Sequence, residues 1–128
     1  MLAKANRITS AEDYRVIVRR GAKVAGAHTV SYLRPRESGT DARFGFIVSK
    51  KVGGAVRRNL IRRRLKAACH EALCDESAGA GIAGVDVVVR ALPSAAVADW
   101  AALRSEVFAA VSNRRARERA AADSTKGA

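Results

Sequence analysis

The side chains of this chain that can do chemistry are mostly cations, and they are concentrated in one stretch. The 128 residues include 24 Lys and Arg against 12 Asp and Glu, a formal net charge of +12. No acidic residue occurs between Asp41 and Glu71. That window holds Arg43, Lys50, Lys51, Arg57, Arg58, Arg62, Arg63, Arg64 and Lys66. Cationic clusters of this kind bind polyanions, and nucleic acid leads the candidates.

The densest part of the window has the spacing of a two-faced helix, expected from about Val56 to Leu73. At about 100° per residue, Leu65, Ala68 and Ala72 stay within about 40° of Ile61, which predicts an apolar stripe that docks on a sheet. The broad basic face beside the stripe comprises Arg58, Asn59, Arg62, Arg63, Lys66 and His70. Arg57 and Arg64 flank the stripe itself. Solvated helices normally mix charge signs, so the absence of acids favours phosphate contact, without deciding between DNA and RNA.

Lys50 and Lys51 precede two glycines, between an expected strand over 42–50 and this helix. Amides at a helix N-terminus together with two lysines form a natural phosphate site, and a plain glycine turn explains the residues about as well. The run lacks the Walker pattern, so nucleotide hydrolysis is not indicated. Tyr14 and Tyr32 offer ring faces for unstacked bases, although core packing is the favoured interpretation from the residues alone.

No catalytic set is visible, neither Ser/His/Asp nor paired carboxylates, and no metal-ligand cluster. Cys69 and Cys74 are interpreted as reduced thiols, because about 140° separates them around a helix and they cannot pair. His70 beside them does not complete a metal site, since ligands on different faces of one helix cannot converge on one ion. His28 is given no role.

The expected elements are a helix opened by a capping box at Thr9–Glu12 and ended by Gly21, strands over 23–34, 42–50 and 85–92, and two further helices. The last helix is expected to be capped by Pro93 and Ser94 and to run to Val111. This order predicts an α+β two-layer sandwich, a small mainly antiparallel sheet with helices mainly on one face. Residues 1–115 are expected to form one RNA-binding domain and residues 116–128 a flexible tail. No apolar run approaches the ~20 residues of a membrane span, and no secretory signal is visible, so a cytoplasmic protein is expected.

The run from Phe44 to Lys66 resembles the protein component of bacterial ribonuclease P. That family has a strand ending in Ser-Lys-Lys, then Val/Ile-Gly-x-Ala-Val, then a helix with Arg-Asn-Arg and further bases. The resemblance extends to Arg7 and Ile8, to the helix around Tyr14, to Gly21 and to residues 86–90, and covers roughly residues 6–112. It implies a fourth strand, because the family's hairpin would split residues 22–50, and a left-handed βαβ crossover, a fold shared with one domain of a small-subunit ribosomal protein.

The resemblance also implies a function. The family's protein is the accessory subunit of an RNA-based endonuclease, a ribonucleoprotein hydrolase that removes the 5′ leader of precursor tRNA. Mg²⁺ held mainly by the RNA is the implied cofactor, and the protein supplies no catalytic residue. The implied partners are the ribonuclease P RNA and the precursor tRNA leader, with a protein monomer in a 1:1 complex and no membrane contact.

The family's site residues carry over onto two groups in this sequence. The implied RNA-binding group is Lys50, Lys51, Arg57, Arg58, Asn59, Arg62, Arg63 and Lys66. The implied leader-cleft group is Tyr14, Val18, Val30, Tyr32 and Ile47, which revises the packing interpretation of the two tyrosines. Leu60 stands where the family has its second arginine, so the RNA-binding role of that arginine is missing here or is taken over by Arg57 or Arg64. Val18 stands where the family commonly has an aromatic residue, which implies weaker leader stacking.

Two alternatives remain open on charge and size. A structural RNA-binding protein of ribosomal type explains the charge but not the ordered motif between Phe44 and Lys66. A small DNA-binding regulator explains the arginine-rich helix, but a helix-turn-helix pair and a dimer surface are not legible in the sequence.

Overall fold

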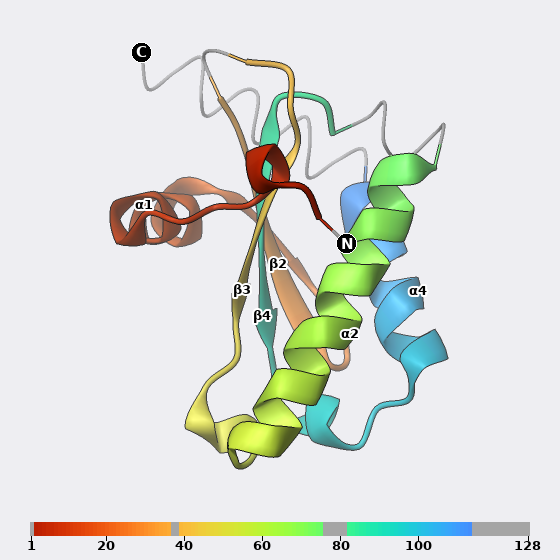
Figure 1. The fold of residues 1–128 in the computed structure, drawn as a ribbon. Helices are drawn as coiled ribbons and strands as arrows, with labels where there is room; N and C mark the ends of the chain where they lie inside the picture. Colours follow the sequence, from red (N-terminus) through yellow and green to blue (C-terminus); the bar gives the residue numbers. More distant parts are fainter. Residues whose placement is uncertain (1, 37–38, 76–81, 114–128) are drawn as a thin grey trace.

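A four-stranded sheet runs through the middle of the molecule and separates its helices (Figure 1). The computed structural model describes residues 2–36, 39–75 and 82–113. The strands are β1 (Ala22–Ala25), β2 (Thr29–Pro35), β3 (Arg43–Ile47) and β4 (Val85–Ala91), in the order β1-β2-β4-β3. β2 pairs antiparallel with β1 and β4, whereas β3 pairs parallel with β4, so the sheet is mainly antiparallel, as expected.

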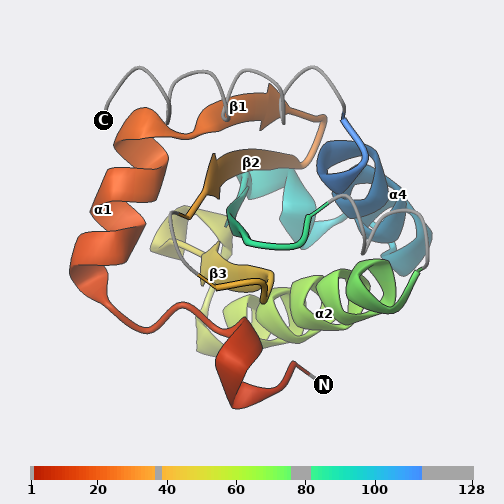
Figure 2. The ribbon, with the colours of Figure 1, turned by 90° about the horizontal axis from the view of Figure 1, so that it is seen from above.

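Three helices pack on the sheet, and they cover both of its faces (Figure 2). α1 (Ala11–Arg20) crosses one face, while α2 (Ala55–Cys74) and α4 (Trp100–Val111) lie side by side on the other. Short 3₁₀ turns occur at Lys4–Asn6, Lys50–Val52 and Pro93–Ala96. The expected α+β sandwich is therefore confirmed, and among the described residues α1 is the one helix on the second face.

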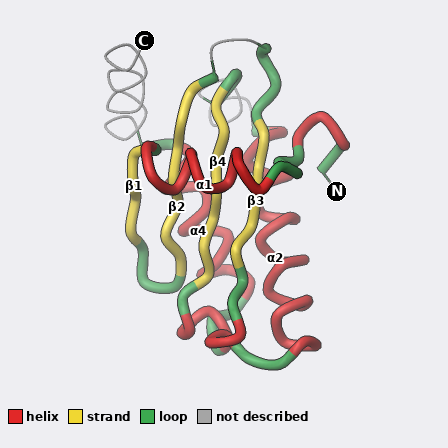
Figure 3. Tube along the Cα trace, turned by 90° about the vertical axis from the view of Figure 1, so that its left-hand side faces the viewer, coloured by secondary structure: helices red, strands yellow, loops and turns green. Residues whose placement is uncertain are grey.

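The β3–α2–β4 connection is a left-handed crossover, the arrangement that the family resemblance implies. β3 and β4 are parallel neighbours, and α2 connects them on the face opposite α1 (Figure 3). With α2 toward the viewer and the strands running upward, β4 lies to the left of β3. Such crossovers are rare: about 98% of the connections between parallel strands of one sheet are right-handed. The hand of this connection puts the basic helix beside β3 at the edge of the sheet.

Strand alternation divides the apolar residues into two clusters. Phe44 on β3 and Val87 on β4 point to the α2 and α4 side, where they pack with Leu65. Val88, one residue along β4, points to the α1 side and packs with Ile17. Because side chains alternate along a strand, the alternation expected for residues 44–48 determines which of them face α1 and which face α2 and α4.

The single strand expected over 23–34 is wrong, because the structure breaks it into a hairpin. Gly26 donates to the carbonyl of Thr29 across the turn at 2.8 Å. The carboxylate of Glu106 on α4 accepts from the backbone amides of His28 at 3.0 Å and Thr29 at 3.1 Å. An acid 77 residues away in the chain thus stabilises the turn, and no local sequence signal reveals it. The three strands within residues 22–50 agree with the family's hairpin.

The helix ends also differ from expectation. Ser10 caps α1 by accepting from the Asp13 amide at 3.4 Å, so the cap lies one residue later than the expected box. Asp99, not Pro93 and Ser94, caps α4, with the Ala102 amide donating to its carboxylate at 2.8 Å. A carboxylate satisfies amides that open the helix, which proline cannot do.

The expected tail over 116–128 lies outside the described residues, as do residues 76–81 of the linker before β4. None of the helices in the described ranges is long and apolar enough to cross a membrane. Cys69 is buried and Cys74 exposed, and neither forms a disulfide, so the expected free thiols are confirmed. Burial raises the pKa of the Cys69 thiol.

A buried carboxylate joins three strands at one end of the sheet. Asp86 on β4 is 5% exposed and accepts from Arg43 Nε at 2.8 Å and from Arg36 at 2.6 Å. A second bond from Arg43 makes that pair bidentate, at 2.7 Å. The hydrogen bond to Asp86 is the main cause that raises the pKa of Arg43. Because Arg43 begins β3 and Arg36 follows β2, this ion-pair cluster holds both strands to β4.

We expect Asp86→Ala to lower the free energy of unfolding by about 3–5 kcal/mol, because it leaves two guanidinium groups without their buried partner. The matched control is Glu12→Ala, which breaks an exposed pair with Arg15 and should cost less than about 1 kcal/mol. Urea denaturation followed by circular dichroism measures both variants. Equal losses for the two would show that the cluster does not hold the strands.

Candidate nucleic-acid interface

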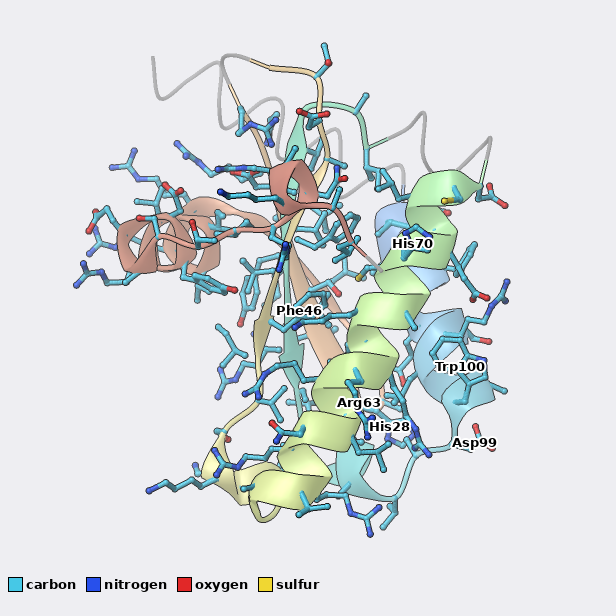
Figure 4. All side chains as sticks on the ribbon, in the orientation of Figure 1. His28, Phe46, Arg63, His70, Asp99 and Trp100 are labelled. Carbon is cyan, nitrogen blue, oxygen red and sulfur yellow. The ribbon has the colours of Figure 1, made fainter. Side chains whose placement is uncertain are left out.

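The apolar stripe of α2 fixes how the helix is rotated on the sheet. Ile61, Leu65, Ala68 and Ala72 are all fully buried, as their helical spacing predicts. Cys69 is fully buried beside them and widens the stripe. Figure 4 shows Phe46 between β3 and α2, where it packs against this core. With the stripe against the sheet, the opposite side of α2 faces away from the protein.

The predicted cations of α2 all reach the surface of the protein, to different degrees. Arg57, Asn59 and Arg63 are exposed, and Figure 4 marks Arg63 on the helix. Arg58, Arg62 and Lys66 are half-buried. Val56, Asn59, Arg62, Arg63 and Lys66 line a shallow open hollow of about 540 Å³ along the helix. We call Arg57, Arg58, Asn59, Arg62, Arg63 and Lys66 the basic face of α2.

The positive charge of this face is not neutralised by the protein. Within the described ranges, none of its arginines or its lysine forms an ion pair. Arg62 donates to the side-chain oxygen of Asn59 at 3.1 Å, a bond that orients the guanidinium without cancelling its charge. Arg58 Nε is buried and has no acceptor among these residues. A donor of this kind is normally satisfied by water or by a ligand.

Arg64 and Arg57, the two residues flanking the stripe, have different surroundings. Arg64 is half-buried and donates to the carbonyl of Ala98 at 3.2 Å, so it ties α2 to the segment before α4. Arg57 is exposed, and its stem lies over Gly53. Leu60 replaces a family arginine, and Arg57 and Arg64 are the two residues that could take over its role. Because Arg64 is bonded within the protein, only Arg57 is free to reach a partner.

The turn before α2 leaves the helix N-terminus uncapped. Lys50 and Lys51 lie in a 3₁₀ turn and are exposed. Gly53 has φ +153°, a conformation that favours glycine, and Gly54 is the N-cap without any side-chain bond. No acid occupies the first turn of α2. The first amides of the helix therefore have no side-chain cap, and phosphate binding at this turn stays a prediction.

The second predicted group gathers on the other face of the sheet, under α1. Val30 and Tyr32 are buried there with Ile17, and Tyr14, Val18 and Ile47 pack against them half-buried. We call Tyr14, Val18, Val30, Tyr32 and Ile47 the α1-side cluster. The structure brings all five together. Contact of these residues with a leader stays a prediction.

Tyr14 is held against β3 by two contacts. Its hydroxyl accepts from the Phe46 amide at 3.1 Å, and its ring lies over Gly45, where an added Cβ would approach the ring to 2.6 Å. Tyr32 is only 7% exposed, so it packs as core, the interpretation favoured by the residues alone. Tyr14, Val18 and Ile47 retain partial exposure and are the members that can meet a ligand.

The predicted groups omit an exposed cation of the central strand β4. Arg90 is exposed on β4, an otherwise largely buried strand, and follows the parity of Val88 toward the α1 side. A lone arginine in a run of valines is the sequence signal that would have found it.

Metal-binding side chains do not converge in the described residues, where no group of three His, Cys, Asp or Glu lies together. Cys74 Sγ approaches His70 Nε2 to 3.8 Å, one turn apart on α2. His28 Nδ1 lies 2.9 Å from Ser94 Oγ, which ties the hairpin turn to the segment after β4.

The geometry defines a class of protein, a small α+β domain that presents an unneutralised basic helix to a polyanion. Comparison with known proteins identifies the family. The family model for ribonuclease P matches residues 2–115, and the chain belongs to this family. Membership makes it a ribonuclease P protein component with a role in tRNA processing and with the ribonuclease P RNA as its partner.

Individual relatives agree with that assignment. The chain is 48% identical over 113 residues to the ribonuclease P protein component of Clavibacter michiganensis, covering 87% of this chain and 94% of the relative. It is 42% identical over 111 residues to that of Pseudarthrobacter chlorophenolicus, covering 87% and 78%. The RNase P protein of Staphylococcus aureus superposes with a TM-score of 0.65 at 29% identity, covering 81% and 90%. That of Thermotoga maritima superposes at 0.69 with 21% identity, covering 83% and 94%, which supports the fold.

We expect Gly45→Ala to destabilise the protein by about 1–3 kcal/mol, because the new methyl group displaces the Tyr14 ring from the sheet. Tyr14→Phe keeps the ring and removes only its hydrogen bond, and should cost about 1 kcal/mol. Thermal unfolding of both variants and of the double variant is the measurement. A Gly45→Ala protein as stable as the wild type would mean that Tyr14 is not held in this position.

Proposed function

We propose that this protein binds the ribonuclease P RNA through the basic face of α2 and holds the single-stranded 5′ leader of precursor tRNA along the α1-side cluster. In this way it assists the Mg²⁺-dependent removal of the leader by the RNA. The single observation that carries the proposal is the unneutralised basic face, which lies on the opposite side of the sheet from the α1-side cluster.

The basic face supports the RNA-binding part. Like charges one turn apart repel in an isolated helix by a few tenths of a kcal/mol per pair. Phosphate contact removes that cost and releases counterions, which supplies most of the affinity of such faces. Guanidinium groups match phosphate oxygens bidentately, and four of the six residues of the basic face are arginines.

The α1-side cluster supports the leader-binding part. Ile47 and Val18 offer partly exposed apolar contact, and Tyr14 presents an aromatic ring held at a fixed angle. Base stacking on an aromatic ring contributes about 1–3 kcal/mol per base. Such contacts tolerate any sequence, which suits a leader that differs between tRNA precursors.

The division of labour leaves the chemistry to the RNA. Mg²⁺ supplies the Lewis acid and the activated water for hydrolysis of a phosphodiester. In the proposal the RNA holds this ion, and the protein contributes cations and stacking surfaces that position RNA. One protein chain acts per RNA.

Reconstitution tests the proposal. The protein is mixed with a bacterial ribonuclease P RNA at low magnesium, and cleavage of precursor tRNA is followed under single-turnover conditions. We expect faster cleavage than with RNA alone, because the protein supplies positive charge that magnesium otherwise provides. Cleavage no faster than with RNA alone would contradict the proposed role, and RNA binding without any effect on processing would then favour the structural RNA-binding alternative.

The basic face makes a separate prediction about salt. Arg62→Ala should weaken binding to ribonuclease P RNA and reduce the slope of log affinity against log salt by about 0.7–0.9 for each phosphate that the variant no longer neutralises. The matched control is Arg19→Ala, an exposed arginine on α1 outside both groups. Filter binding at four or five salt concentrations measures both. An unchanged slope for Arg62→Ala would mean that this arginine is only solvated.

A further inference from the structure

Arg90 occupies an unusual place for a charged residue, near the C-terminal end of the central strand β4. Val87, Val88 and Val89 just before it are at most 1% exposed, whereas Arg90 itself is exposed. Alternation puts its side chain on the α1 side of the sheet, the side of Val88. Since it remains exposed, α1 does not cover this part of the sheet.

The neighbours of Arg90 across the sheet are apolar. Val30 on β2 and Ile47 on β3 are its partners in register, so the three form one row across the sheet, with the arginine in the middle. Leu92, two residues further on, is partly buried in the same cluster. Arginine buries its aliphatic stem along apolar surface while its guanidinium stays in water, which suits this position.

The guanidinium of Arg90 has no partner in the described part of the chain. It forms no ion pair and no side-chain hydrogen bond there. Asp86 shares its strand and its face, but lies four residues, about 13 Å, away along the strand. That carboxylate is already held by Arg36 and Arg43. The guanidinium of Arg90 therefore adds no ion pair or hydrogen bond to the sheet within the described residues.

We propose that Arg90 binds one backbone phosphate of the single-stranded leader, with the partly exposed Ile47 beside it contacting the adjoining sugar or base. This inference rests on the proposed function and adds a residue that the α1-side cluster lacks. The cluster by itself offers only apolar and aromatic contacts, which neither attract a phosphate nor fix the register of a strand. A planar cation in the middle of an apolar row does both, because phosphate contacts set position along the backbone.

The test uses the holoenzyme reconstituted with ribonuclease P RNA, and precursor tRNAs that carry one uncharged methylphosphonate at each leader position in turn. Binding of precursor is measured from the dependence of single-turnover cleavage on holoenzyme concentration, and binding of mature tRNA from its inhibition of that cleavage as a competitor. We expect Arg90→Ala to weaken binding of unmodified precursor at least about tenfold, and binding of mature tRNA very little. Arg90→Lys, which keeps the charge, should recover part of the loss, and Arg19→Ala on the outer side of α1 should cause none.

The phosphate scan identifies the contact. At one leader position the methylphosphonate should weaken binding by the wild-type holoenzyme about as much as Arg90→Ala does, and it should have no further effect on the variant. Unchanged precursor binding by Arg90→Ala, or additive effects at every position, would overturn the inference. Equal losses for precursor and mature tRNA would also overturn it, since Arg90 would then act on another surface. A different result would contradict the proposed function itself, namely a wild-type protein that does not enhance cleavage by the RNA.

Discussion

The orientation of the basic face depends on how α2 packs against the sheet. Ile61 and Leu65 are fully buried, and burying such side chains contributes about 1.5–3 kcal/mol each. Repulsion between like charges one turn apart costs about 0.2–0.5 kcal/mol per pair. Packing therefore outweighs repulsion, and the helix forms with its cations together on one side. The rotation that buries the stripe also turns these cations away from the protein.

The sheet keeps the two functional surfaces apart. Alternation along β3 sends Phe44 and Phe46 toward α2 and Ile47 toward the α1 side. The Asp86 ion-pair cluster holds the starts of β3 and β4 together at one end, so the register that carries Ile47 beside Arg90 is maintained. A partner RNA on α2 and a second strand of RNA on the α1 side would thus be separated by α2 and the sheet.

Local periodicity is enough to predict most of the elements that position the site. Helical spacing predicts the buried stripe of α2, and strand alternation predicts which face of the sheet Ile47 occupies, because both patterns repeat within one element. The hairpin at Gly26 escapes prediction because its turn is stabilised by Glu106, which comes much later in the chain. The Asp99 cap escapes it because Pro93 gives a competing start signal.

Long-range pairing explains the remaining differences. Arg64 belongs to the basic window in sequence, but its bond to Ala98 gives it a structural role that spacing cannot reveal. Arg43 belongs to the same window, and Asp86 neutralises it. Arg90 lies outside the window, yet the sheet register brings it to the α1-side cluster. The charge along the sequence therefore indicates the kind of partner, whereas tertiary contacts determine which of the charged side chains remain unpaired.

The central claim is that position, and not the net charge of +12, directs RNA binding. The most direct measurement compares two variants that each lose four positive charges, in binding to ribonuclease P RNA at one salt concentration. One replaces members of the basic face with glutamine, and the other replaces exposed cations elsewhere. The first set is Arg58, Arg62, Arg63 and Lys66, and the second is Lys4, Arg15, Arg19 and Arg20. The account predicts a large loss of affinity for the first variant and a small one for the second. Equal losses would contradict it, because they would make binding a property of total charge.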